Sequence, residues 1–332
     1  MMTVMCPKVG VRPTQPVTRW ETPLGGRDVW LLSRRTGKAG SLKYSRRRML
    51  EEAGRLGLSV RLVDANAVEI IRRPSGRTRY RYQGRAMSLP CAVFARAGAY
   101  TNLAARAIVA SLEAEGVACF PSARGLAFGV DKLATAVALK RAGLPCPATI
   151  DLRPGQDIGA LSDIIGYPLV VKPLAGLKGQ HVSLCRTPAD LARVLEKTGS
   201  KRQLLAQAFV SESAGQDLRI LVAGGRVVAA MVREAPSGEF RSNVALGGQA
   251  RAVAAPREAE QIALKAAQVL DLQIAAVDLL FGAEGFTICE VNVAPGFEAL
   301  ETVTGLNVAG AMMGLVPERS LAEHGFSAAA LT

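Results

Sequence analysis

The pattern of apolar and polar positions in the first third of the chain alternates short apolar runs with a longer stretch of helical period. Apolar runs at 29–32 and 60–63 flank a helical pattern at 45–56. This strand–helix–strand order predicts two parallel strands in one sheet. Residues 77–82 alternate long side chains and are expected to form an exposed strand, whereas the continuously apolar run 91–94 is expected to be buried.

The same reasoning divides the chain into four segments. A helix at 102–115, ended by Gly116, and a strand closing at Phe120 complete a first α/β unit. Further elements are predicted at 130–142 and 188–197 (helices), 169–172 and 181–185 (strands), 204–210, 218–222 and 227–233 (strands), 256–270 (helix), and 276–281 with 286–291 (a hairpin). We therefore expect a Pro-rich flexible arm (1–26), an N-terminal α/β domain (27–121), a central domain (122–202) and a C-terminal domain (203–320).

Composition places the chain among globular proteins. Of its 332 residues, 49% are hydrophobic and 21% are charged, which excludes disorder for most of the chain. No stretch approaches the ~18 consecutive apolar residues of a membrane-spanning helix. Six cysteines without a closely spaced pair argue against a zinc site or a disulfide scaffold. Because the first 26 residues also lack the apolar core of a signal peptide, we expect a cytoplasmic protein.

Charge is distributed unevenly along the chain. The net charge is +13, and residues 34–85 hold fifteen Lys or Arg against four acidic residues. Such a field attracts polyanions: nucleic acid, an anionic membrane or an acidic peptide. A basic face that serves only solubility is an equal alternative. If the partner is acidic, Arg46, Arg47 and Arg48 are expected to attract it over a long range.

The hairpin carries the most informative chemistry. A turn centred near Glu284 makes positions that sum to 568 face one another, which places Asp278 opposite Glu290. Asn292 lies on the same face because side chains alternate with a period of two. Facing carboxylates on an apolar hairpin repel each other and are costly to bury unpaired. A Mg²⁺ ion, with Mn²⁺ as an alternative, resolves that conflict; a solvent-facing pair that tolerates the repulsion is the other interpretation.

Two further groups of residues suit phosphate. Lys172 ends an apolar strand and precedes a loop in which Gly176 and Gly179 let backbone amides approach phosphate oxygens. In a later loop, Arg241, Ser242 and Asn243 offer guanidinium, hydroxyl and amide groups to a phosphate or a developing oxyanion. Alone, the lysine is equally a surface residue and the loop an ordinary polar turn, but together with the hairpin they indicate a nucleotide site.

The motifs together resemble the RimK-like glutamate ligases of the ATP-grasp superfamily. The resemblance covers about residues 27–316 and rests on Phe240-Arg241-Ser242-Asn243 with Gly247-Gly248, on Asp278 with Glu290-Val291-Asn292, and on Pro295-Gly296-Phe297-Glu298 with Thr304-Gly305. It implies a three-domain α/β ATP-grasp fold with an N-terminal parallel-sheet domain and with ATP held between the sheets of the other two domains.

The resemblance also implies roles for individual residues. Phosphates would meet Lys132, Lys172, Arg241, Ser242 and Asn243; adenine would meet Ala208 and Phe209; the ribose would meet Asp217; Mg²⁺ would meet Asp278, Glu290 and Asn292; Arg219 and Arg241 would act in catalysis and Arg96 near the acceptor. Two positions depart from the family pattern. Ala208 stands where the hinge usually has an acidic residue, and His181 stands where glycine is frequent and is read as a strand or lid residue.

The implied activity is ATP-dependent ligation of a carboxylate to an amine through an acyl phosphate. L-glutamate or a similar amino acid would be added to an acidic acceptor, either the C-terminal tail of a ribosomal protein or a glutamate-bearing pterin, furan or deazaflavin cofactor. The alternative is a basic nucleic-acid-binding protein on a catalytically silent ATP-grasp scaffold, which leaves the carboxylate pair and Lys172 unexplained. A membrane partner is not expected, and the oligomeric state is left open.

Overall fold

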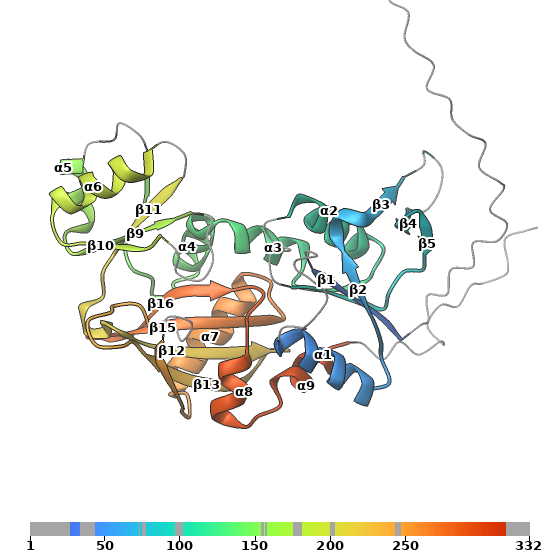
Figure 1. The fold of residues 1–332 in the computed structure, drawn as a ribbon. Helices are drawn as coiled ribbons and strands as arrows, with labels where there is room; N and C mark the ends of the chain where they lie inside the picture. Colours follow the sequence, from blue (N-terminus) through green and yellow to red (C-terminus); the bar gives the residue numbers. More distant parts are fainter. Residues whose placement is uncertain are drawn as a thin grey trace, which may run out of the picture.

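The computed structural model describes residues 27–33, 44–72, 74, 78–96, 102–153, 156, 158–174, 181–199, 203–242 and 247–316. The described residues form four β-sheets and the helices packed on them (Figure 1). The Pro-rich arm expected over residues 1–26 lies outside them, as do Gly176, Gly179 and Asn243. Among the described helices, none is long and apolar enough to cross a membrane.

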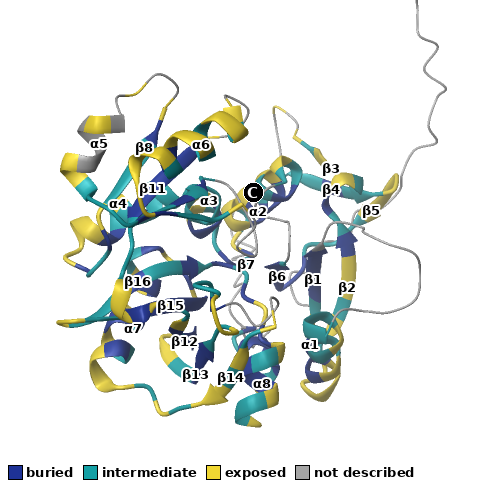
Figure 2. Ribbon diagram, turned by 60° about the vertical axis from the view of Figure 1, so that its left-hand side comes forward, coloured by how far each residue is buried: buried dark blue, intermediate teal, exposed yellow. Residues whose placement is uncertain are grey.

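The N-terminal domain is built on a four-stranded parallel sheet of order β2-β1-β6-β7. Its elements are β1 (Asp28–Ser33), α1 (Tyr44–Arg55), β2 (Ser59–Asp64), β6 (Ala92–Ala95), α2 (Leu103–Ala114) and β7 (Ala118–Phe120). The side chain of Asn102 accepts hydrogen bonds from the first amides of α2 and so fixes where the helix begins. The parallel pairing predicted from the sequence is confirmed, and Figure 2 shows β1 and β6 as buried strands.

A small antiparallel sheet extends the N-terminal domain. Its strands are β3 (Val68–Ile71), β4 (Arg79–Tyr82) and β5 (Arg85–Met87), preceded by the short helix η1 (Ala65–Ala67). The sequence predicted an exposed strand here, but Tyr80 of β4 is only 2% exposed. Its ring meets Trp30 edge-on, and its hydroxyl lies 2.6 Å from Ser111 Oγ. The alternation therefore marks a two-faced strand, with arginines on one side and tyrosines turned toward the core.

The central domain carries an antiparallel sheet of order β10-β9-β11-β8. Its elements are α3 (Ala123–Val130), α4 (Lys132–Arg141), β8 (Thr149–Leu152), α5 (Ile158–Ile165), β9 (Leu169–Pro173), β10 (Ser183–Cys185), α6 (Pro188–Thr198) and β11 (Leu204–Ala208). Strand β11 pairs with both β8 and β9, so it belongs to this sheet rather than to the C-terminal unit in which the sequence analysis placed it. His181 lies in a turn at φ 59°, before β10 begins.

The C-terminal domain is a five-stranded sheet of order β14-β13-β12-β15-β16 with α7 packed on it. Its elements are η3 (Ser211–Ser213), β12 (Gln216–Ala223), β13 (Arg226–Glu234), β14 (Gln249–Ala252), α7 (Arg257–Val269), β15 (Ile274–Gly282), β16 (Gly285–Asn292), α8 (Glu298–Thr304) and α9 (Val308–Met313). Figure 1 shows this sheet below the central domain, with a hinge of residues 209–215 between β11 and β12.

The predicted pairing of Asp278 with Glu290 is confirmed, but for a reason the turn alone does not give. The turn is one residue tighter than expected, because Gly282 pairs with Gly285 rather than with Phe286. A bulge that leaves Cys289 unpaired then restores the register, so that Asp278 faces Glu290 and Ala276 faces Asn292. Without the bulge, Glu290 would point to the opposite face of the sheet from Asp278.

The N-terminal and C-terminal domains share a continuous core. Buried residues of β1, α1 and β6 pack in one cluster with buried residues of β12, β13, α8 and α9. Beside this cluster, Arg48 of α1 donates to Glu301 of α8 over 2.9 Å and to Asn307 over 3.0 Å. Arg48, grouped in the sequence analysis with Arg46 and Arg47 as a long-range attractor of an acidic partner, thus ties the two domains together.

Candidate active site

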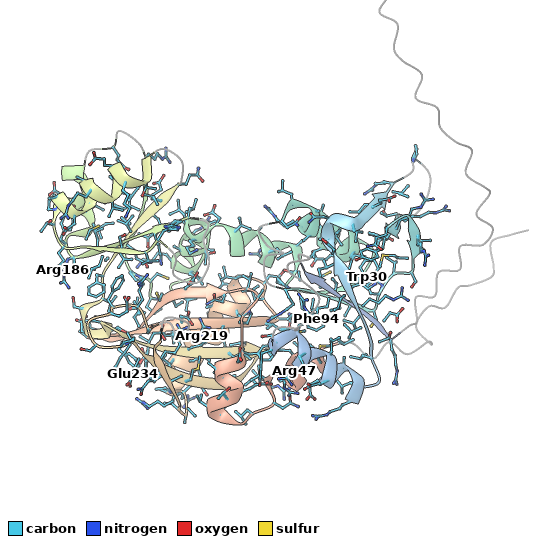
Figure 3. The ribbon with its side chains drawn as sticks, in the orientation of Figure 1. Trp30, Arg47, Phe94, Arg186, Arg219 and Glu234 are labelled. Atoms are coloured by element: carbon cyan, nitrogen blue, oxygen red, sulfur yellow. The ribbon has the colours of Figure 1, made fainter. Side chains whose placement is uncertain are left out.

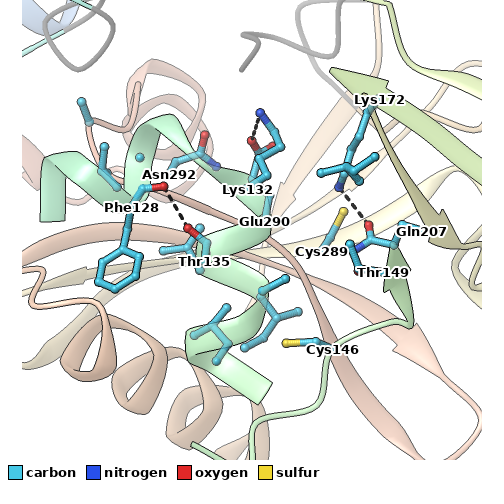
Figure 4. A pocket seen from close by; sticks show the side chains of 18 residues that line it. Phe128, Lys132, Thr135, Cys146, Thr149, Lys172, Gln207, Cys289, Glu290 and Asn292 are labelled. Carbon is cyan, nitrogen blue, oxygen red and sulfur yellow. Dashed lines mark hydrogen bonds and ion pairs between the residues drawn. The ribbon is translucent and has the colours of Figure 1, made fainter. Parts of the chain in front are cut away.

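A cleft lies between the central sheet and the edge of the C-terminal sheet. One wall is formed by β8, β9 and β11, the other by β16, and α4 closes the end between them. The polar side chains that face one another across it are labelled in Figure 4. They are Lys132, Thr135, Thr149, Lys172, Gln207, Glu290 and Asn292. Residues about 160 positions apart in the sequence thus meet in one cleft.

Lys172 reaches into this cleft from β9 and is held there by Gln207 of β11. Lys172 Nζ donates to Gln207 Oε1 over 2.8 Å, and Gln207 Nε2 donates to Thr149 Oγ1 over 3.0 Å. Gln207 is only 8% exposed, and both ends of its amide are hydrogen-bonded within the wall of the cleft. The ammonium group consequently has a fixed position, and its remaining N–H groups can meet an anion.

Lys132 approaches the same space from the opposite side. It is the first residue of α4, whose N-terminus is capped by Asp131. Its Nζ lies 3.7 Å from Glu290 Oε1. Gly129, one turn earlier, lies so close to the end of β16 that an added Cβ would stand 2.4 Å from Val293, the residue that follows the strand. Close packing of the α3–α4 junction on the strand that carries Glu290 therefore brings the two groups together.

The carboxylate of Asp278 sits in a buried ion-pair network below the cleft. Arg219, its neighbour on β12, donates to both of its oxygens over 2.7 Å. Arg233 lies 3.1 Å and the amide nitrogen of Asn292 3.2 Å from Oδ2. Burial opposes ionisation of Asp278, but the two guanidinium groups outweigh it and lower its pKa. Figure 3 shows Arg219 on the C-terminal sheet.

The oxygens around Asp278 suit a magnesium ion. Glu290 is half-buried and faces the cleft, and Asn292 uses its nitrogen toward Asp278, which leaves its carbonyl oxygen as a ligand. Within the described ranges, no three His, Cys, Asp or Glu side chains gather as a metal site. The Glu290 carboxylate and the Asn292 carbonyl match the oxygen donors that Mg²⁺ prefers, with water and phosphate as further ligands. Asp278 would join them only by giving up part of its contacts with Arg219 and Arg233.

Two cysteine thiols also line the cleft, and neither has the character of a nucleophile. Burial raises the pKa of Cys146 to about 11 and, despite the nearby Lys172, the pKa of Cys289 to about 11. Both thiols are therefore protonated at neutral pH. The cleft holds charged groups for positioning and no activated protein nucleophile among its described lining residues.

Three predicted nucleotide ligands have other partners in this structure. Asp217 is 4% exposed; Arg233 donates to both of its oxygens, and Ser242 Oγ donates to Oδ2 over 2.6 Å. Asp217 therefore cannot reach a ribose in this conformation. Arg241 binds Glu239 through Nε at 3.0 Å and Nη2 at 2.7 Å, and lowers the pKa of Glu239 to about 2.

The backbone amides of the hinge and the side chain of Arg96 also have partners within the protein. The backbone N–H of Ala208 donates to Ala148 O, and that of Phe209 donates to Pro168 O. These amides are thus committed to the fold, and Gln207 is the hinge-side residue that lines the cleft. Arg96 donates to Pro295 O over 2.6 Å and stacks on Phe297, so it holds the loop that follows β16. Burial lowers the pKa of Arg96 to about 10, which leaves it charged at neutral pH.

Sequence reasoning missed Gln207, Thr149 and Arg233. Gln207 is polar within an otherwise apolar strand, which is the signal that could have selected it, whereas Thr149 and Arg233 share their strands with other polar residues. Their partners, however, lie on other strands whose order the sequence does not reveal.

The two facing sheets, with Lys172 and Lys132 reaching into the cleft from opposite sides and Glu290 on β16, are those of an ATP-grasp ligase. The chain belongs to the RimK-like ATP-grasp family: residues 129–316 match the RimK-like ATP-grasp domain. A probable alpha-L-glutamate ligase of Serratia proteamaculans is 35% identical over 278 residues, which span 83% of this chain and 92% of that protein. The family resemblance stated from the motifs is therefore confirmed.

Solved structures agree on the fold. A RimK-domain ATP-grasp protein of Sphaerobacter thermophilus superposes with a TM-score of 0.65 at 23% identity, over 86% of this chain and 98% of that one. The ATP-grasp ligase PsnB, complexed with its minimal precursor, Mg and ADP, superposes with a TM-score of 0.66 at 17% identity, over 88% of this chain and 98% of that one.

Proposed function

We propose that this protein joins L-glutamate to an acidic acceptor by an ATP-dependent reaction through an acyl phosphate. The observation that carries the proposal is the convergence of Lys132 and Lys172 with Glu290 and Asn292 in one cleft. The proposal draws its amino-acid substrate from the name of relatives such as that of Serratia proteamaculans, and its acidic acceptor from the basic N-terminal segment.

In the first step, a carboxylate oxygen of one substrate attacks the γ-phosphorus of ATP, and the bond to the bridging oxygen of ADP breaks. The amine of the second substrate then attacks the acyl carbon, loses a proton and expels inorganic phosphate. No protein side chain is bonded to substrate at either step. The protein therefore acts by positioning and by neutralising charge.

The described residues suit these tasks. Lys172, fixed by Gln207, would hold a phosphate oxygen from one wall, and Lys132 would do so from the other. Arg219 holds the carboxylate of Asp278 in place through two hydrogen bonds. Asp278, Glu290 and Asn292 would hold Mg²⁺, which when bound neutralises phosphate charge. Separation of Lys132 from Glu290 would free both groups for these partners.

The activity is tested by product mass and by isotope transfer. The protein is incubated with ATP, Mg²⁺, glutamate and a peptide that ends in glutamates. Mass spectrometry then measures how many glutamyl residues have been added to the peptide. Peptide carboxylates labelled with ¹⁸O should deliver one label to the inorganic phosphate released, because the acyl phosphate transfers that oxygen. Formation of AMP, or release of unlabelled phosphate with product, would exclude the proposed route.

A further inference from the structure

One face of the C-terminal sheet changes from apolar to charged along β12. Leu221 lies in the core that is shared with the N-terminal domain, and Arg219 and Asp217, two and four positions earlier, lie on the same face of the strand. The register pairs Asp217 with Arg233 of β13, and Arg219 with Asp278 of β15. Asp217, Arg233 and Asp278 are each only 4% exposed. Charged groups are rarely so deeply buried unless they pair with one another.

Arg233 connects the two buried carboxylates. Its Nε donates to Asp217 Oδ1 over 2.7 Å, and its Nη2 donates to Asp217 Oδ2. The same Nη2 lies 3.1 Å from Asp278 Oδ2. The guanidinium group holds its donors in one rigid plane, so the contact with Asp217 keeps Arg233 beside Asp278. Neither Asp217 nor Arg233 is among the described residues that line the cleft. Any effect of this pair on a nucleotide must therefore pass through a neighbouring residue.

Asp217 also holds the segment 239–242, which leads into the loop that is expected to meet phosphates. Ser242 Oγ donates to Asp217 Oδ2 over 2.6 Å, and Ser242 is buried. The backbone N–H of Gly215 donates to Phe240 O over 3.2 Å. Gly215 has a φ of 77°, and an added Cβ would stand 3.1 Å from a carbonyl oxygen of the same segment, so glycine permits this close approach. The segment is thus fixed to the start of β12, and Asp217 is its side-chain anchor.

We propose that Asp217 and Arg233 are positioning residues, which hold the segment that carries Ser242 beside Asp278. The inference rests on the proposed function, in which this segment would meet phosphates and Asp278 would meet Mg²⁺, and deepens it by assigning the pair that joins the two. A ribose ligand would need a carboxylate oxygen turned toward the cleft. Both oxygens of Asp217 instead accept from Arg233, and one of them accepts from Ser242 as well. A ribose could reach Asp217 only by breaking a buried ion pair.

The test compares two nucleotides that differ only in the ribose. A non-hydrolysable ATP analogue and its 2′,3′-dideoxy counterpart are titrated into the full-length protein by calorimetry, with Mg²⁺ and without an amino-acid substrate. Asp217→Asn should weaken the binding of both about tenfold, because the defect lies at the phosphates, which the two nucleotides share. Loss of affinity for the hydroxyl-bearing analogue alone would identify Asp217 as a ribose ligand and overturn the proposal. Unchanged affinity for both nucleotides would also overturn it.

Arg233→Lys is the second variant, because it keeps a buried positive charge but loses the planar set of donors. It should weaken the binding of both nucleotides equally, although Arg233 does not line the cleft. The double variant Arg233→Lys/Ser242→Ala should lose less affinity than the sum of the single losses, since both residues act through Asp217. Additive losses would overturn the proposal.

Arg251→Lys is the matched control. Arg251 lies on β14 of the same sheet and forms an exposed ion pair with Glu234, so the substitution should change neither affinity. A loss as large as that of Arg233→Lys would show a general effect of the sheet and overturn the proposal. Melting curves check that each variant is folded. Because only nucleotide binding is measured, failure of the ligase reaction leaves this comparison interpretable.

Discussion

At the scale of single residues, the position of Lys172 depends on a neighbour that carries no charge. Gln207 accepts from the lysine with one end of its amide and donates to Thr149 with the other. An amide held at both ends cannot rotate without breaking a hydrogen bond in a mostly buried site. The lysine is therefore preorganised, and less entropy is lost when an anion binds.

Gln207→Leu should weaken nucleotide binding because Lys172 loses its acceptor and Thr149 loses its donor. The loss expected is about 1–3 kcal/mol, and Lys172→Ala should lose a similar amount. Calorimetric titration with a non-hydrolysable ATP analogue measures both. The double variant should lose less than the sum, since the two residues act as a unit. Additive losses, or unchanged affinity in Lys172→Ala, would remove the lysine from the site.

Glu290→Gln should abolish ligation while leaving the melting temperature nearly unchanged. Glu290 is half-buried and only 3.7 Å from Lys132, so the fold depends little on its charge, whereas a metal ion would. Turnover at several Mg²⁺ concentrations is the measurement, and Glu284→Gln, in the hairpin turn, is the control. Near-normal turnover in Glu290→Gln would contradict its assignment as a metal ligand.

At the scale of elements, α1 and α8 are joined by a cluster centred on Glu301. Tyr44 Oη donates to Glu301 Oε2 over 2.7 Å, Arg48 Nε donates to the same oxygen, and the amide of Ala309 donates to Oε1. Helix α8 follows β16 by a short loop that Arg96 holds through Pro295. The N-terminal domain thereby fixes the segment that continues from Asn292.

Arg48→Met should destabilise the protein by about 2 kcal/mol, because it leaves the nearly buried carboxylate of Glu301 without its main counter-charge. The matched control is Arg47→Met on the same helix, whose side chain is 53% exposed and whose ion pair should be worth under about 1 kcal/mol. Urea unfolding followed by circular dichroism gives both values. Equal effects of the two substitutions would show that the cluster does not join the domains.

At the scale of the whole molecule, ion pairs make the stability depend on pH. The pKa values of Glu301, Asp278 and Glu52 are lowered in the folded protein, in each case because arginines or hydrogen-bond donors outweigh burial, and the pKa of Glu239 falls to about 2. A lowered folded pKa means that the unfolded chain binds protons first as pH falls. The stabilisation is complete above the ordinary carboxyl pKa of about 4–4.5 and is lost below it.

The melting temperature should therefore change little between neutral pH and about pH 5 and fall steeply below about pH 4.5. The melting temperature of Glu301→Gln should be lower at neutral pH and should fall less steeply with acidification, because one proton-linked group has been removed. Scanning calorimetry across this range is the measurement. A parallel loss in the wild type and in Glu301→Gln would mean that Glu301 contributes nothing to the acid dependence.

The sequence by itself determined what depends on neighbours along the chain. Alternation and helical period indicated the parallel strands around α1, and the hairpin pattern brought Asp278 near Glu290, because pairing in a hairpin follows from chain connectivity. The bulge at Cys289, which the pattern does not show, sets the final register that makes the two residues face each other. The motif set also identified the family, which the match over residues 129–316 confirms. Lys172, at the end of an apolar strand, was found for the same local reason.

Only the tertiary structure decided which distant strands lie side by side. The order β10-β9-β11-β8 places Gln207 beside Lys172 and moves β11 into the central sheet. The order of the C-terminal sheet pairs Arg219 with Asp278. It also places Asp217 where it accepts hydrogen bonds from Arg233 and is not available to a ribose. Helix packing likewise turned Arg48 inward to Glu301. A charged side chain takes the partner that burial brings within reach, and the order of strands, which a linear pattern does not contain, selects that partner.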